Sequence, residues 1–512
     1  MTRMSEVAIT PLGPRGDEAV GRPKRRLTLV LLVIAAAARI PFLWHGFGGH
    51  PDEWLVVRSG LDLWLHGSYY PSRVPGYPLD EMLMGGLARL GGATACAAAA
   101  TVASLVTLAY MRGLAPLYGI RNSFWMVLAF SFEPWVWSSG THGLDYIWGT
   151  SSLVAALYYT ERRQSTAAGL ACAVGFGFRP SSLLWIIPVF VRVLIVRRNW
   201  REVLRFSLWA ALPALIPTAM IIRVMLTRPD VWAGQGAYNL KMIESSFIPL
   251  SLLAVYHFLE LLGFISALVI AIACFRRREK LTELFRSGEG WIWIVVLIFV
   301  CLLPTFVLES GKTEYMLPAL PGLFMILGRC LTDNWWKGVT AAFVVSAFIS
   351  FGFGHAPHPG GLRIAMAVPT LRPGALLWYA AGANASSDRV RRIGSELTQT
   401  SRIVHADPDM DRLDDFYVSS LLKRGPASQA RISCPLVPAF LSFWKDRSPQ
   451  ISPSPGLPKA RPSQFPILVC CRSKSGLVLS STPSAYNDAL LETVRGFCEP
   501  VLARGPQTQA VR

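Results

Sequence analysis

Long apolar runs are the feature that most constrains the fold of this chain. The first covers residues 27–44, and further runs follow at approximately 93–111, 122–139, 144–160, 165–178, 182–196, 203–226, 250–275, 291–308, 315–331 and 339–354. Several of them reach the ~18 apolar residues that a helix needs to cross a bilayer. Only 16% of the residues are charged, against about a quarter in soluble domains. We therefore predict an all-α polytopic membrane protein with roughly 11 transmembrane helices.

The first run also fits a second interpretation, because a basic stretch followed by an apolar core is typical of a signal peptide. Its length and the many later runs favour a membrane-spanning helix instead.

The basic residues indicate how the chain is oriented. The formal net charge is +18, which on a soluble chain could indicate nucleic-acid binding. Here Lys and Arg concentrate in alternate segments between apolar runs, the pattern of cytoplasmic loops facing anionic lipid. This predicts a cytoplasmic, basic N-terminus at residues 1–26 and a transmembrane domain at 27–354. The polar motifs described below then share the outer face, and no nucleic-acid partner is expected.

The composition changes after residue 354. Short apolar runs alternate with amphipathic stretches, so we predict a small α/β extracytoplasmic domain at residues 355–512. An oxidising compartment would permit disulfides among its cysteines, Cys434, Cys470, Cys471 and Cys498. We expect a bacterial inner membrane with this domain in the periplasm, or an endoplasmic-reticulum membrane and lumen if the source is eukaryotic.

The stretch "GHPDEW" places His50, Asp52 and Glu53 just beyond the first span. One carboxylate could act as a general base on a hydroxyl group, and Asp52 is the first choice with Glu53 as its helper or substitute. His50 is a candidate for substrate binding. The structural alternative is that the two acids only cap the N-terminus of a helix and interact favourably with its dipole. A divalent metal could bind here, but no second ligand cluster supports one, so no metal or cofactor is expected.

The next outer stretch, "YYPSRVPGYPLDEM", contains Arg73 and Tyr77. A guanidinium group can hold a phosphate through its planar set of donors, and Tyr77 could contact substrate. The alternative for Arg73 is an interfacial arginine within an aromatic belt. Asp80 and Glu81 are expected to cap a short interfacial helix rather than to act in catalysis.

Three later outer motifs add to the candidate site. "GFGFRPSS" contributes Arg179, since a charge near membrane depth usually pairs or lines a cavity. "ESGKTEY" contributes Lys312 as a point charge for phosphate, with Glu314 and Tyr315 as substrate-binding candidates. "THGLDY" contributes His142 and Asp145. The structural alternatives are a surface ion pair of Lys312 with Glu314 or with Glu309, and a helix cap at Asp145.

These motifs resemble the GT-C superfamily of membrane glycosyltransferases, and most closely its polyprenyl-phosphate-mannose-dependent mannosyltransferases of glycosylphosphatidylinositol and N-glycan assembly. The resemblance covers residues 27–330. Its matching positions are His50, Pro51, Asp52 and Glu53; Arg179, Pro180 and Ser181; and Lys312, Glu314 and Pro318. The chain departs from the family at Gly311, where the family has histidine, and at the inserted Thr313. A divergent branch is therefore implied.

The resemblance implies an inverting hexosyltransferase that takes a sugar, mannose as the first expectation, from a polyprenyl-phosphate donor. The acceptor would be a hydroxyl of a lipid-linked or surface glycan. Arg73, Arg179 and Lys312 would stabilise the phosphate that leaves. One alternative is another lipid-dependent transferase or ligase that modifies lipopolysaccharide or protein. Another is a transporter or flippase, although transporters place their charges near the midplane of repeated halves.

Overall fold

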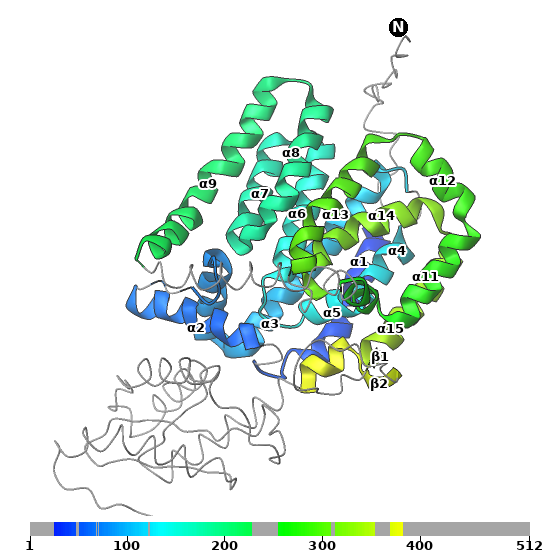
Figure 1. The fold of residues 1–512 in the computed structure, drawn as a ribbon. Coiled ribbons are helices and arrows are strands. Elements are labelled where there is room, and N and C mark those ends of the chain that lie inside the picture. The colour runs from blue at the N-terminus through cyan, green and yellow to red at the C-terminus, as the bar shows by residue number, and fades with distance from the viewer. Residues whose placement is uncertain are drawn as a thin grey trace, which may run out of the picture.

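The computed structural model describes residues 25–47, 51–67, 69, 71–120, 123–227, 254–308, 313–353 and 369–381. Within these ranges the chain is helical apart from connecting loops and one two-stranded sheet (Figure 1). The expected fold class, an all-α polytopic membrane protein, is confirmed. The predicted α/β domain lies outside the described residues except for 369–381.

The N-terminal half contains nine labelled α-helices and two short 3₁₀ turns within the described ranges. They are α1 (Arg25–Arg39), η1 (Ile40–Phe42), α2 (Pro51–His66), α3 (Pro78–Leu117), α4 (Phe124–Phe132), α5 (Pro134–Ser139), α6 (Tyr146–Glu161), α7 (Ser165–Phe178), η2 (Pro180–Ser182), α8 (Leu183–Arg197) and α9 (Trp200–Thr227).

The C-terminal half continues with a helix at Ala254–Leu262 and then α11 (Phe264–Arg276), α12 (Arg278–Arg286), α13 (Gly290–Leu308), η3 (Thr313–Ala319), α14 (Leu320–Cys330) and α15 (Asp333–Phe348). Strands β1 (Ile349–Phe353) and β2 (Pro369–Pro373) pair antiparallel, with Ile349 opposite Pro373 and Phe353 opposite Pro369. Residues 375–381 are helical.

Four helices in the described part of the chain are long and apolar enough to cross a membrane: Pro78–Leu117, Pro180–Arg197, Trp200–Thr227 and Gly290–Val307. The pair Ala254–Leu262 and Phe264–Arg276, bent by 88°, makes a fifth if it counts as one span. The other predicted runs also contain helix, but in shorter pieces. The sequence therefore predicts the helical segments better than it predicts their lengths.

Helix α3 is interrupted at a glycine pair. Gly91 has φ −149° and ψ 19°, and Gly92 has φ 64° and ψ −152°, a conformation that residues with a Cβ avoid. The predicted short interfacial helix and the following span are thus two parts of one helix joined by a kink. The first part carries Asp80 and Glu81 in its first turn.

Helices α2 and α3 meet backbone to backbone. A Cβ atom on Gly60 would lie 1.7 Å from the carbonyl oxygen of Glu81, and one on Gly85 would lie 2.5 Å from the Cα atom of Gly60. Small residues permit such close helix contacts inside membranes. This crossing fixes α2 against the first turns of α3, and it therefore fixes the distance between their polar residues.

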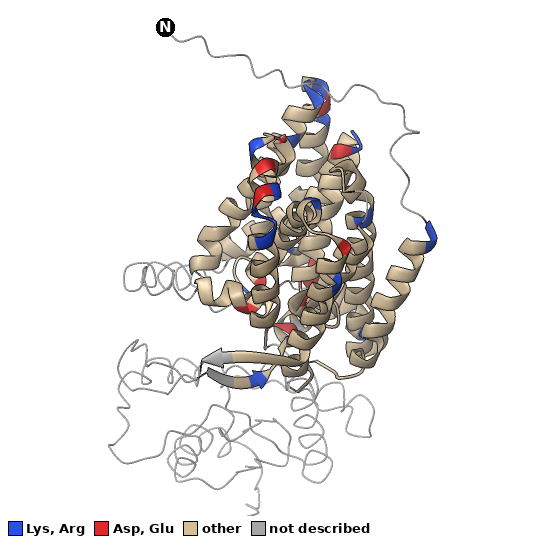
Figure 2. Cartoon of the chain, turned by 90° about the vertical axis from the view of Figure 1, so that its right-hand side faces the viewer, with Lys and Arg blue, Asp and Glu red and all other residues tan. Residues whose placement is uncertain are grey.

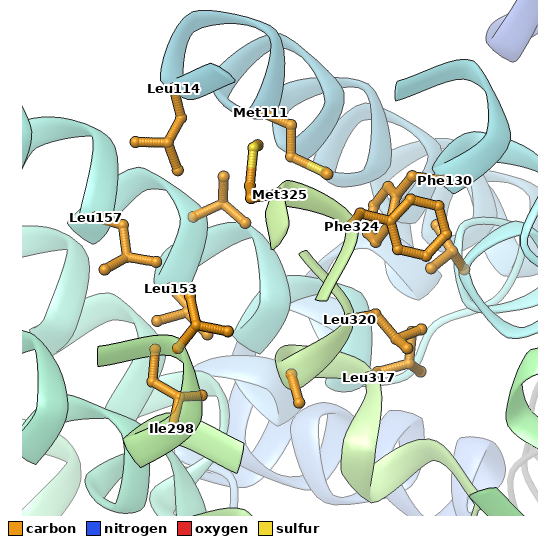
Figure 3. Close-up of a cluster of buried hydrophobic side chains, with 14 of the residues drawn as sticks. Met111, Leu114, Phe130, Leu153, Leu157, Ile298, Leu317, Leu320, Phe324 and Met325 are labelled. Atoms are coloured by element: carbon orange, nitrogen blue, oxygen red, sulfur yellow. The ribbon is translucent and has the colours of Figure 1, made fainter. Parts of the chain in front are cut away.

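The interior of the bundle is filled by apolar side chains from helices far apart in sequence. Figure 3 shows one part of it, where α3, α4, α6, α13, η3 and α14 meet; its labelled residues are Met111, Leu114, Phe130, Leu153, Leu157, Ile298, Leu317, Leu320, Phe324 and Met325. Large apolar side chains also lie exposed on the outside, such as Ile216 and Leu226 of α9. An apolar exterior suits contact with lipid rather than water.

Charged residues are unevenly distributed over the described helices. Most of the Lys and Arg lie toward the end of the molecule opposite the β1–β2 hairpin (Figure 2). The positive-inside interpretation requires such an asymmetry, and the orientation itself stays a prediction.

The segment 369–381 packs against the membrane helices. Leu376 lies in one apolar cluster with Trp137 of α5 and Ala347 of α15. The change in composition predicted this segment to belong to the C-terminal domain. In the structure its Tyr379 contacts Glu314 of η3.

Candidate active site

One buried carboxylate joins two arginines. Asp145 is fully buried, and its Oδ1 accepts a hydrogen bond from Nη2 of Arg73 at 2.8 Å. Its Oδ2 accepts from Nη1 of Arg179, which is 3% exposed. We call Arg73, Asp145 and Arg179 the arginine relay. The three residues come from the loop before α3, the residue preceding α6 and the residue following α7.

The position of Asp145 immediately before α6 is that of a helix cap, as the sequence suggested. However, its side chain makes no capping hydrogen bond to that helix and turns to the two guanidinium groups instead. The helix-cap alternative for Asp145 is therefore wrong.

Burial alone would raise the pKa of Asp145, but the nearby Arg73 and Arg179 lower it below its usual range. Conversely, burial alone would lower the pKa of Arg73, and the carboxylates of Asp145 and Asp52 raise it. All members of the relay are therefore charged at neutral pH.

Aromatic rings cover the guanidinium groups of the relay. Arg73 lies 4.1 Å from the ring centre of Tyr77. Arg179 lies 4.3 Å from the ring of Tyr146 and 4.4 Å from that of Tyr315. Such cation–π contacts are strongest away from water. Tyr77 and Tyr315 were predicted to touch substrate; in the structure their rings hold the arginines.

The two acids at the start of α2 face different partners. Oδ2 of Asp52 lies 3.2 Å from Nη1 of Arg73, and the Asp52 side chain is 14% exposed. Glu53 is 2% exposed, and its Oε1 accepts a hydrogen bond of 3.0 Å from the backbone N–H of Gly143. Asp52 is therefore the carboxylate at the accessible end of the relay, while Glu53 holds the turn that precedes Asp145.

A second group of predicted residues meets the segment 369–381. The ring of Tyr379 stacks on His142 at 4.3 Å, and its hydroxyl donates a 2.7 Å hydrogen bond to Oε1 of Glu314. Glu314 is only 4% exposed, so a surface pair with Lys312 does not describe its environment. Sequence reasoning missed Tyr379, which has no motif around it, and Tyr146, the neighbour of Asp145.

Two predicted residues, His50 and Lys312, lie outside the described residues. Among the residues that are described, no group of three or more His, Cys, Asp or Glu side chains is arranged to hold a metal ion.

The neighbours Asp80 and Glu81 are both fully buried, yet their contacts differ. Glu81 accepts hydrogen bonds from the hydroxyl of Tyr69 at 2.6 Å, from the N–H of Ser72 at 2.6 Å and from the N–H of Tyr77 at 3.3 Å. It thereby ties the loop that carries Arg73 to α3. Neither side-chain oxygen of Asp80 has a hydrogen-bond partner in the described structure, so Asp80 is not the predicted cap.

Comparison with known proteins adds little to this geometry. No protein-family model and no curated protein matches the chain. One solved structure, the crystal structure of ArnT from Cupriavidus metallidurans in the apo state, is similar with a TM-score of 0.41 and 14% identity. The match covers 61% of this chain and 61% of that one.

Proposed function

We propose that this protein is a membrane glycosyltransferase that moves a sugar from a polyprenyl-phosphate donor to a hydroxyl of a lipid-linked or surface glycan. The observation that carries the proposal is Asp52 at the accessible end of the buried arginine relay. A carboxylate and two guanidinium groups held together supply a base for the acceptor and positive charge for a departing phosphate.

In the proposed reaction Asp52 removes the proton from the acceptor hydroxyl. The acceptor oxygen then forms a bond to the anomeric carbon, while the bond from that carbon to the phosphate oxygen breaks. The products are the inverted glycoside, polyprenyl phosphate and protonated Asp52. A phosphate leaves as an anion, so no second carboxylic acid and no cofactor is needed. Glycoside hydrolases, by contrast, need an acid to protonate their leaving group.

The relay has donors left for the phosphate. Nε of Arg73 and Nη2 of Arg179 are buried without a hydrogen-bond partner in the described part of the chain. The contact between Arg73 and Asp52 is long, at 3.2 Å. A phosphate that binds Arg73 would compete with Asp52 for that guanidinium group. Donor binding would thereby make Asp52 a stronger base when it is needed.

The finer details of the proposal rest on the sequence. The "HPDE" motif resembles the mannosyltransferase family, which makes mannose the first sugar to test. The distribution of Lys and Arg supports a site on the outer face. Lys312 would add a third cation for the phosphate, and His50, His142 and Glu314 would contact the sugar or the acceptor.

The test is transfer by the purified protein in liposomes that contain a polyprenyl-phosphate sugar and membrane glycolipid acceptors. We expect Asp52→Asn to reduce transfer by about 10²- to 10⁴-fold, the usual contribution of a general base. Its thermal unfolding midpoint should stay near the wild-type value, because Asp145 still pairs with Arg73. Near-normal transfer by both Asp52→Asn and Glu53→Gln would contradict the assignment of the general base to this pair of acids.

The alternative transferase, a ligase acting on lipopolysaccharide or protein, would share this base and this relay. It separates from the first proposal by its acceptor, which can be identified as the glycan that loses a sugar when the gene is deleted. A transporter would instead carry the lipid-linked sugar across the liposome without cleaving it.

A further inference from the structure

Four unsatisfied polar atoms on Arg73, Arg179 and Asp80 are of two kinds. Nε of Arg73 and Nη2 of Arg179 are hydrogen-bond donors without a partner, and both oxygens of Asp80 are acceptors without one. All four atoms are buried in the described structure. Buried polar atoms nearly always have a partner, so each of these calls for an explanation.

These groups belong to one place in the molecule. Glu81, the residue after Asp80, accepts a 2.6 Å hydrogen bond from the N–H of Ser72, the residue before Arg73. Leu79, the residue before Asp80, lies 3.1 Å from where a Cβ on Gly177 would be, two residues before Arg179. Asp80 is therefore beside the arginine relay, although it pairs with neither arginine. Asp80 is 0% exposed, and full burial makes an unpartnered carboxyl group costly, so folding alone gives no reason to keep it.

A single ligand with both acceptors and donors would satisfy the whole set. Phosphate oxygens accept hydrogen bonds from guanidinium groups, and sugar hydroxyls donate hydrogen bonds to carboxylates. A glycosyl phosphate carries both within one or two bonds of its anomeric carbon. A lipid phosphate without a sugar would leave Asp80 unsatisfied.

We propose that Asp80 binds a free hydroxyl of the transferred sugar and so makes the site selective for sugar-bearing lipid phosphates. This inference rests on the proposed glycosyltransferase function. It makes Asp80 a substrate-binding residue, in addition to the base at Asp52 and the phosphate site at the relay.

Glu81 offers a matched control. It is the next residue, equally buried, and its oxygens are occupied by Tyr69, Ser72 and Tyr77. Removing its charge should lower the thermal unfolding midpoint. Replacing the carboxyl group of Asp80, by Asp80→Asn or Asp80→Leu, should leave the midpoint unchanged or raise it, since that group makes no hydrogen bond that folding would lose.

The experiment measures the midpoint of purified protein in detergent with two kinds of short-chain lipid. One is polyprenyl phosphate alone, and the other is a panel of polyprenyl-phosphate hexoses that includes mannose. We expect the wild type to be stabilised by both and more strongly by one of the hexoses. In Asp80→Asn and Asp80→Leu the extra stabilisation by the sugar should be lost and that by the phosphate kept.

Transfer gives a second readout. Loss of a hydrogen bond to a charged group predicts that kcat/KM falls about 10- to 150-fold in Asp80→Asn. With the monodeoxy donor that lacks the bound hydroxyl, wild type and Asp80→Asn should be equally slow.

The outcomes separate the two proposals. If no lipid stabilises the wild type and none supports transfer, the glycosyltransferase proposal fails, and the role of Asp80 fails with it. If the wild type transfers sugar and Asp52→Asn does not, while the Asp80 variants keep full kcat/KM and the full sugar-dependent stabilisation, only the role of Asp80 is overturned.

Discussion

In the described part of the chain two carboxylates are each shared by two arginines. They lie at opposite ends of α8, because Arg179 directly precedes η2 and α8 whereas Arg197 is the last residue of α8. Asp145 pairs with Arg73 and Arg179. Glu202, at the start of α9, pairs with Arg197 at 2.9 Å and with Arg205 at 2.8 Å. The two clusters have the same charges and nearly the same hydrogen bonds.

Their environments differ. The side chain of Asp145 is 0% exposed and that of Arg179 is 3% exposed, whereas Glu202 is 21% and Arg205 57% exposed. Water and salt screen the pairs around Glu202, so their energy is small. Around Asp145 burial keeps water from replacing a lost partner. A carboxylate thus holds the α8–α9 turn at Glu202, whereas at Asp145 it holds two arginines of the candidate site in place.

Asp145→Asn should have the largest effect. It leaves two buried guanidinium groups without their shared counter-charge, which costs about 3–5 kcal/mol when one partner of a buried pair is removed. We expect a clearly lower thermal unfolding midpoint in detergent together with loss of transfer. An unchanged midpoint would mean that the arginine relay contributes no more to the stability of the folded protein than the more exposed cluster at Glu202 does.

The pH dependence of the same pair of proteins gives a further check. The pKa of Asp145 is lowered in the folded protein, so its contribution to stability is present above the unfolded value of about 3.9 and disappears as the pH falls through the lowered value. The midpoints of wild type and Asp145→Asn should therefore converge only in strong acid. Convergence already near neutral pH contradicts the assignment.

Gly60→Ala should have an intermediate effect. Its Cβ would lie 1.7 Å from the carbonyl oxygen of Glu81, so α2 must move away from α3. Overpacking of this kind costs about 1–3 kcal/mol and would shift Asp52 relative to Arg73. We expect a lower midpoint and reduced transfer. Gly338→Ala serves as the control, because nothing lies within 4 Å of a Cβ there.

Glu202→Gln should have the smallest effect. The partly exposed pair with Arg197 and the pair with the exposed Arg205 predict a cost of about 1 kcal/mol, and transfer should be unchanged. The measurement is the same melting experiment at low and high salt, where the small difference should shrink further at high salt. A loss as large as that of Asp145→Asn would erase the distinction between the two clusters.

Much of the candidate site could be predicted from residue type and position. Arg179 was selected because a charge near membrane depth needs a partner or a cavity, and Arg73 because a guanidinium group can hold a phosphate. Asp145 was selected as an acidic residue of an outer turn. What could not be predicted was that Asp145 binds both arginines. The partners are separated by 72 and 34 residues, and nothing local in either motif indicates the other.

The contacts of Asp80 and Tyr379 also could not be predicted from the local sequence. Asp80 lies in the first turn of a helix, where capping is the usual role of an acid, and only its unpartnered oxygens contradict that role. Tyr379 follows a change of composition that predicted a separate domain. Its contact with Glu314 depends on the pairing of β2 with β1, which the alternation of residues did not reveal.

The sequence by itself determined the membrane class and the helical segments, because hydropathy acts over about 20 neighbouring residues and needs no knowledge of packing. It also determined which polar residues were candidates. Only the tertiary structure decided which carboxylate is shared by the arginines, which is saturated by a loop and which stands without a partner. Hydrogen bonding and burial are properties of side chains brought together from distant helices, and the close crossing of α2 and α3 at Gly60 is part of what brings them together.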